Sequence, residues 1–134
     1  MGLQGMSTSR EFINFLHEVF EQFGPIQAKR MFGGYGIYHD GLMFGLVVAN
    51  QLYLKVDEDN RSFFTDLQLD PFIFEMKGKP VHLSYHQAPA SLMDEREVAA
   101  LWARRSWEAA WRAQAAKAQQ SARAKARKRL PSSS

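Results

Sequence analysis

Apolar and aromatic residues are crowded into three short segments of residues 30–57, RMFGGYGIYHDGLMFGLVVANQLYLKVD. Glycines and hairpin-turn residues separate these segments at residues 33–34, 39–41 and 49–51, so the pattern predicts an antiparallel meander of β-strands. Successive side chains of a strand point to opposite faces of a sheet. In its last strand one face carries Leu52, Leu54 and Val56, and the other carries Tyr53, Lys55 and Asp57. We expect the first face to be core and the second to be partly exposed to water.

A helix is predicted before the meander, over residues 9–23. Its apolar side chains recur every three or four residues and form a stripe that should pack on the sheet. This stripe consists of Phe12, Phe15, Leu16, Val19, Phe20 and Phe23. Thr8 and Glu11 have the spacing of a capping box, and Gly24 followed by Pro25 indicates the end of the helix.

Residues 26–32 are expected to open the sheet, and a short second helix is predicted over residues 58–69 with Asp57 as its cap. Two further strands should follow, over residues 72–76 and 80–86. The Lys-Gly-Lys sequence between them predicts a tight turn.

The pattern is helical again from Ser91, where Asp94 and Glu97 form a second candidate capping box. The expected inner stripe of this last helix consists of Val98, Leu101, Trp102 and Arg105. Beyond Trp111 the stripe fades into strong helix formers, so the helix should continue to about Lys128 without a core of its own. Such a helix is longer than a domain of this size is wide, and we expect another chain or a bound partner to order its outer end.

Together these elements predict an α+β fold, in which an antiparallel sheet of five to six strands is packed by an N-terminal helix, a short middle helix and a long C-terminal helix. We expect one domain over residues 9–103. A basic helical tail rich in Ala, Arg and Lys, residues 104–134, should continue the last helix. A chain of 134 residues with 46% hydrophobic side chains has room for one sizeable core.

The glycines and aromatic residues of the meander resemble the signature of the TfoX/Sxy N-terminal domain. The positions that carry the resemblance are Met31, Phe32, Gly33, Gly34, Gly36, Tyr38, Gly41, Phe44, Tyr53, Leu54 and Lys55. As a pattern of elements the likeness extends over residues 9–87. It implies a regulatory domain that takes part, with a DNA-bound regulator, in transcriptional control of competence, the uptake of DNA by bacteria. Fuller members carry a second, helix-hairpin-helix-like domain, whose place the basic helix takes here.

The net charge of +3 conceals a strong asymmetry. Residues 1–103 contain 8 Lys and Arg against 13 Asp and Glu, a net charge of −5. Residues 104–134 contain 9 against 1, a net charge of +8. A basic extension of this kind indicates contact with nucleic acid or an acidic partner; the alternative is a solubilising helix whose cations complement the acidic part of the chain.

Several classes of site find no support in the sequence. The chain has no cysteine, which excludes disulfides, thiol catalysis and cysteine-ligated metal. Gly34 and Gly36 are followed by more strand, so turn or bulge geometry is preferred to nucleotide binding. The four histidines lack metal-ligand spacing. No apolar run approaches the roughly 20 residues that span a bilayer, and a cytoplasmic location is expected.

Catalytic motifs are also not evident. The sequence shows no Ser-centred elbow, paired-carboxylate motif or Walker lysine. The acidic run at residues 57–59 suits helix capping. Lys55 is the strongest single candidate, but a lysine on the exposed face of a strand is the plainer interpretation. We therefore expect a protein that is not an enzyme, with no catalytic residue, no metal and no cofactor.

Three functions remain. The leading one is regulation through protein–protein contacts, with a transcription regulator as a candidate partner. The second is non-specific nucleic-acid binding through the tail, which needs only clustered cations. The candidate contacts are Arg112, Lys117, Arg123, Lys125, Arg127, Lys128 and Arg129. The third is a homo-oligomer without a competence role, in which the last helix is a dimerisation arm; its three tryptophans, in helical register, suit packing or oligomer contacts.

Overall fold

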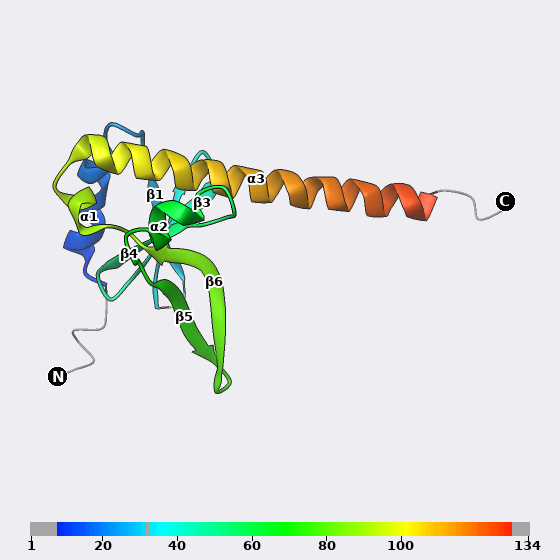
Figure 1. Ribbon diagram of the computed structural model, residues 1–134, viewed down its shortest axis with the longest axis horizontal. Helices are drawn as coiled ribbons and strands as arrows, with labels where there is room; N and C mark the ends of the chain where they lie inside the picture. The colour runs from blue at the N-terminus through cyan, green and yellow to red at the C-terminus, as the bar shows by residue number, and fades with distance from the viewer. Residues whose placement is uncertain (1–7, 32, 130–134) are drawn as a thin grey trace.

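The computed structural model describes residues 8–31 and 33–129 (Figure 1). In this part of the chain six antiparallel strands form one sheet, in the order β1-β2-β3-β4-β6-β5. The strands are β1 (Gln27–Met31), β2 (Gly34–His39), β3 (Leu42–Val48), β4 (Gln51–Lys55), β5 (Pro71–Met76) and β6 (Lys79–Gln87). The helices are α1 (Arg10–Val19), α2 (Arg61–Thr65), the 3-10 helix η2 (Ala90–Met93) and α3 (Arg96–Arg129). The predicted α+β fold class is confirmed.

Two-residue turns join three pairs of neighbouring strands. Asp40 and Gly41 both have positive φ, 49° and 79°, as do Ala49 and Asn50, 53° and 58°. The Lys-Gly turn between β5 and β6 has the same geometry, with φ of 54° and 78°. Turns of this hand match the twist of the flanking strands. The predicted turns therefore lie where the sequence pattern places them.

The paired glycines between β1 and β2 serve two purposes. Gly33 has a φ of 76°, which confirms that one of the two adopts a conformation that favours glycine. A Cβ at Gly34 would collide with the carbonyl oxygen of Val47. The pair thus lets the chain turn and lets β2 lie close against β3.

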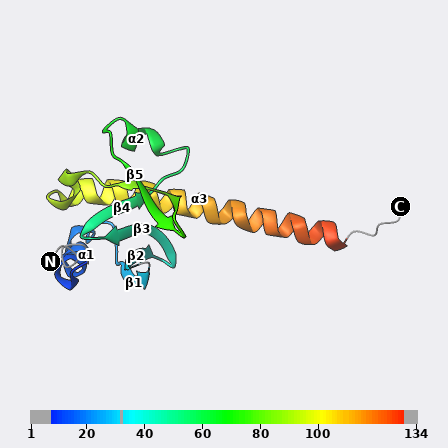
Figure 2. The ribbon, with the colours of Figure 1, turned by 90° about the horizontal axis from the view of Figure 1, so that it is seen from below.

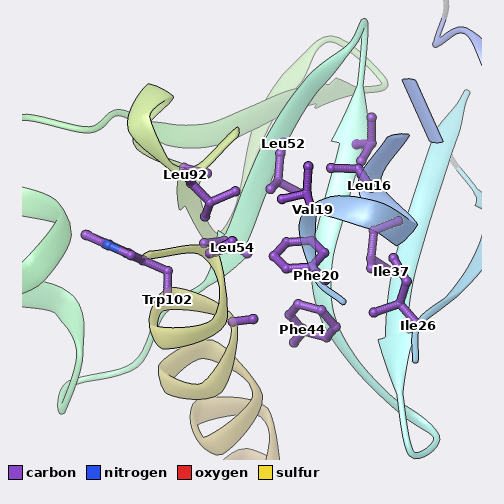
Figure 3. Packing of buried hydrophobic residues seen from close by; sticks show 14 of the residues in the cluster. Leu16, Val19, Phe20, Ile26, Ile37, Phe44, Leu52, Leu54, Leu92 and Trp102 are labelled. Carbon is purple, nitrogen blue, oxygen red and sulfur yellow. The ribbon is translucent and has the colours of Figure 1, made fainter. Parts of the chain in front are cut away.

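The core lies between the sheet and two helices. α1 and the first half of α3 pack on the same face of the sheet (Figures 1 and 2). Figure 3 shows side chains of both helices meeting those of the strands, among them Leu16, Val19, Phe20, Phe44, Leu52, Leu54 and Trp102. The predicted faces of β4 are confirmed, because Leu52, Leu54 and Val56 are buried here.

The opposite face of the sheet carries a second, smaller apolar cluster. Leu46, Phe72 and Tyr85 are buried in it. Six further side chains are partly buried around them: Met31, Met43, Val48, Tyr53, Phe74 and Leu83. Tyr53 and Lys55 lie half-buried on this face, as the alternation predicts.

The prediction for the first helix is wrong at both ends. Ser9, and not Thr8, is the N-cap, since its side-chain oxygen accepts a hydrogen bond from the backbone N–H of Phe12 at 3.1 Å. α1 ends at Val19, four residues early, because the backbone turns at Phe20. The stripe also differs, since Phe15 is exposed while Ile13 is buried.

The middle helix is shorter than the predicted residues 58–69, and Asp57 is not its cap. α2 has Asn60 at its N-cap position. Asp57 instead closes the preceding turn, where its Oδ1 accepts hydrogen bonds from the backbone N–H groups of Asp59 and Asn60, at 3.0 and 3.2 Å. A short polar side chain competes well for such local donors.

The beginning and the inner stripe of the last helix are also corrected. α3 begins at Arg96, after η2, so Asp94 does not cap it. Leu101 is 46% exposed, and Arg105 lies over the ring of Phe63. The buried positions of α3 are Ala99, Trp102, Ala103, Ser106, Ala109 and Ala110. Small residues dominate because they let the helix approach the sheet closely.

Candidate functional site

Two side chains fasten α3 to the sheet by hydrogen bonds to strand carbonyls. Ser106 Oγ donates to the carbonyl oxygen of Lys55 at 2.9 Å. Trp107 Nε1 donates to the carbonyl oxygen of His39 at 2.8 Å. His39 is the last residue of β2, and Lys55 is the last residue of β4. These bonds fix the rotation of α3 about its own axis.

An ion pair between Arg112 of α3 and Asp57, which we call the clamp, lies further along the helix. The guanidinium of Arg112 donates two hydrogen bonds to the carboxylate of Asp57, at 2.7 and 3.0 Å. Arg112 Nε also lies 3.3 Å from Asp59 Oδ2. The hydrogen bond from Arg112 lowers the pKa of Asp57 below its ordinary value, and Asp57 raises the pKa of Arg112 in turn. The acidic run at residues 57–59 thus holds the helix as well as its own turn.

Lys55, the last residue of β4, lies at the centre of this region. Its carbonyl oxygen accepts a second hydrogen bond, from Asn60 Nδ2 at 3.0 Å. Its ammonium nitrogen lies 5.4 Å from the centre of the Tyr85 ring. Burial lowers the pKa of the Lys55 ammonium, and the negative charge of Asp57 offsets part of this effect. Lys55 is therefore partly buried, and the ion pairs of the described residues do not include it.

An open cavity of about 340 Å³ lies where α3 leaves the sheet. We call it the arm cavity. Its lining residues are Leu42, Met43, Lys55, Tyr85, Ala110, Ala113, Gln114 and Lys117. Tyr85 is buried in its wall, and burial raises the pKa of its phenol, which donates to the carbonyl oxygen of Met43 at 3.3 Å. The fold therefore joins a lysine of the meander and a lysine of the tail, which lie far apart in the sequence.

Beyond the cavity α3 continues as a basic arm, residues 113–129. Residues 118–128 are all exposed, and Figures 1 and 2 show the helix projecting away from the sheet. Its cations are Lys117, Arg123, Lys125, Arg127, Lys128 and Arg129, and no acidic residue follows Glu108 in the sequence. The prediction that the helix runs well past Trp111 is confirmed. Ordering of its outer end by another chain stays a prediction.

The candidate nucleic-acid contacts thus fall into two groups. Arg112 is engaged by the clamp, while the others belong to the arm. Arg123 and Arg127 share one face of the helix because they are four residues apart, and Lys117 and Lys128 share another. The cations therefore surround the arm. α3 is continuous through residue 103, the predicted boundary between the domain and the tail, and Ser106 beyond this boundary still contacts the sheet. The division of the chain into a domain and a tail stays a prediction.

The family model for the TfoX N-terminal domain matches residues 18–110. The chain belongs to this family. The match covers the sheet, the clamp residue Asp57 and most of the walls of the arm cavity, and it ends before Arg112 and the basic arm. No protein of curated function matches the chain.

The motif residues of this TfoX N-terminal domain chiefly build the sheet. Phe44 and Leu54 are core residues, Gly33 and Gly41 lie in turns, and Gly34 lets β2 approach β3 closely. The other motif positions that the structure describes lie on the second face or at its edge. A Cβ at Gly36 would meet the sulfur atoms of Met31 and Met43, Tyr38 packs under Lys29, and Tyr53 packs against Phe72. Phe32 lies outside the described residues.

A second surface feature of the TfoX N-terminal domain lies where α2 meets α3. Phe63 is 39% exposed, and the guanidinium of Arg105 lies 3.6 Å from the centre of its ring. Leu101, one turn before Arg105, is exposed beside them on α3. We call Phe63, Leu101 and Arg105 the α2–α3 patch. The patch was not predicted from the sequence, because Leu101 and Arg105 were assigned to the buried stripe of the last helix. Their spacing of four residues, which places them on one face of a helix, was the signal that could have indicated the patch.

Two of the four histidines contact backbone carbonyls. His39 Nδ1 lies 2.7 Å from the carbonyl oxygen of Pro25, and His86 Nδ1 lies 2.9 Å from that of Leu69. Within residues 8–31 and 33–129, no three His, Asp or Glu side chains gather where they could hold a metal ion. None of the helices described there is long and apolar enough to cross a membrane.

Proposed function

We propose that this member of the TfoX N-terminal domain family is a non-enzymatic regulatory protein. It acts in the cytoplasm through protein–protein contacts, in the transcriptional regulation of DNA uptake. Family membership supports the regulatory role. The observation that carries the proposal is the α2–α3 patch, in which Arg105 lies over the exposed ring of Phe63 and Leu101 is exposed one turn before Arg105 on α3. Interface centres are enriched in aromatic residues and arginine.

The patch is held in place before any partner arrives. The ring of Phe63 packs edge-on against Trp102, with ring centres 6.4 Å apart, and Trp102 is buried in the core. Arg105 is positioned over both rings. A partner would therefore bind side chains that have already lost much of their freedom, which lowers the entropic cost of association.

Leu101→Asp tests this proposal. Leu101 is exposed, so the fold should tolerate the change, while a carboxylate in the patch should repel an apolar partner surface. Met76→Asp is the matched control, because Met76 is 49% exposed at the end of β5 and lies outside the patch. In cells that carry the gene, Leu101→Asp should lower transformation frequency and competence-gene transcripts, and Met76→Asp should not. Equal values for the two variants would contradict the proposal.

A second candidate function is non-specific nucleic-acid binding, favoured by the geometry of the basic arm. The arm carries its cations away from the acidic part of the chain and presents them on several faces. Its apolar residues are alanines, which bury little surface each. Phosphate neutralisation needs clustered cations and carries no base readout, so the binding should be insensitive to sequence.

The triple variant Lys125→Gln, Arg127→Gln, Lys128→Gln tests this candidate, since glutamine keeps the helix propensity and removes the charge. It should bind duplexes of unrelated sequence more weakly by a similar factor. Lys77→Gln with Lys79→Gln, in the β5–β6 turn, is the control. A loss that depends on DNA sequence, or an equal loss in the control, would rule out the arm as a phosphate-binding element.

A further inference from the structure

We propose that the arm cavity is a phosphate-binding site. Its lining includes two lysines, Lys55 from β4 and Lys117 from α3, together with Gln114. None of its eight lining residues is acidic. Charge-assisted hydrogen bonds from lysines are a common means of holding phosphate, and an amide N–H₂ adds uncharged donors.

Lys55 is the fixed half of the site. Its position is set by β4 and by the Tyr85 ring beneath its ammonium group. The ion pairs of the described residues do not include it, because the nearest acidic cluster binds Arg112 instead. Half-burying a cation costs free energy, and the charge of Asp57 offsets only part of that cost. A bound phosphate would supply the missing counter-charge.

Lys117 is the adaptable half. It is exposed on α3, two turns beyond Ala110, and can swing toward an anion held at Lys55. The remaining walls are apolar, with Leu42 and Met43 on one side and the alanines of α3 on the other. A volume of about 340 Å³ lies at the lower end of the usual range for small-molecule sites. The phosphate can therefore belong to a free nucleotide or to a strand that continues onto the arm.

Lys117 is shared with the arm, whereas Lys55 belongs neither to the α2–α3 patch nor to the arm, so substitutions of Lys55 distinguish this site from both proposed functions. The test is an NMR titration of the labelled full chain with sodium phosphate, compared with sodium chloride at equal ionic strength. Amides near Lys55, Gln114 and Lys117 should shift and saturate with phosphate alone. Lys55→Met and Lys117→Met should each raise the midpoint at least about tenfold, the effect of losing one charge-assisted hydrogen bond. Lys79→Met should leave it unchanged.

Shifts that follow ionic strength, or a midpoint unaffected by both substitutions, would overturn the proposal. If Lys55→Met disturbs the fold, Lys117→Met decides the matter when it is compared with Lys125→Met, an exposed arm lysine outside the cavity that should leave the midpoint unchanged. Adenosine 5′-monophosphate and a short single-stranded oligonucleotide then identify the source. Tighter binding of the nucleotide indicates a small-molecule site, and tighter binding of the strand, lost in Lys55→Met, indicates a backbone phosphate.

Discussion

Removing the guanidinium of Arg112 should weaken the attachment of α3 by a predictable amount. Arg112→Ala deletes two hydrogen bonds to Asp57 and the contact with Asp59. Fully buried charge-assisted bonds contribute about 1.5–3 kcal/mol each, and exposed ion pairs about 0.2–1 kcal/mol in total. The two side chains are 36% and 24% exposed, so screening by water applies but the bidentate geometry is favourable. We expect a loss of about 1 kcal/mol, or roughly 4 °C in Tm for a domain of this size.

The effect should depend on pH with a defined sign. The pKa of Asp57 is lower in the folded protein than the value of about 3.9 expected in the unfolded chain. The clamp therefore contributes its full stabilisation above that unfolded value and loses it as pH falls through the lower, folded value. The stability difference between the wild type and Arg112→Ala should be constant from about pH 5 to pH 8 and should shrink below about pH 4.

A double-mutant cycle in urea isolates the pair. Asp57→Asn keeps an oxygen for the backbone N–H groups of Asp59 and Asn60 while removing the charge. Arg104→Ala, an exposed position on the same helix, controls for the change in helix composition. The double variant should lose about 1 kcal/mol less unfolding free energy than the two single variants lose together. If the two single losses of unfolding free energy add within about 0.3 kcal/mol, the two side chains do not stabilise the fold through each other, and the prediction is wrong.

Three further predictions concern the meander, the helix attachment and the arm. Gly33→Val should cost more than about 1 kcal/mol of unfolding free energy in urea, because its φ of 76° is strained for valine; equal stability would contradict this. Trp107→Phe should cost about 1–2 kcal/mol, since it leaves the carbonyl oxygen of His39 without its donor, and thermal unfolding measures the loss. Native mass spectrometry should show dimers of the full chain and monomers of a chain truncated after Gln114; a full chain that is always monomeric would exclude the dimerisation arm.

The sheet could be predicted because its signals are local. Alternation at residues 52–57 assigned the faces of β4, and turn residues at residues 39–41 and 49–50 fixed two hairpins. The inner face of α3 could not be predicted in the same way. Hydrophobicity favours Leu101 over Ala109, yet the helix lies so close to the sheet that alanine is buried and leucine is not.

The arm cavity could not be predicted from the periodic spacing of apolar residues along the sequence. Lys55 and Lys117 each stood out in the sequence, one in the motif and one in the basic tail. Their meeting depends on where α3 crosses the sheet, which the contacts of Ser106 and Trp107 determine. No spacing rule relates residues whose proximity is set by tertiary contacts of this kind. The clamp between Asp57 and Arg112 was missed for the same reason.

The division of the molecule into an anchored body and a cationic arm is tested most directly by duplex DNA binding across a range of salt concentrations. Truncation after Gln114 removes the six cations of the arm and leaves the clamp intact. For the full chain, the slope of log affinity against log salt should be steeper than about −4 if all six meet phosphates. The truncated chain should keep its fold and lose binding. A flat salt dependence, or unchanged binding after truncation, would contradict the account.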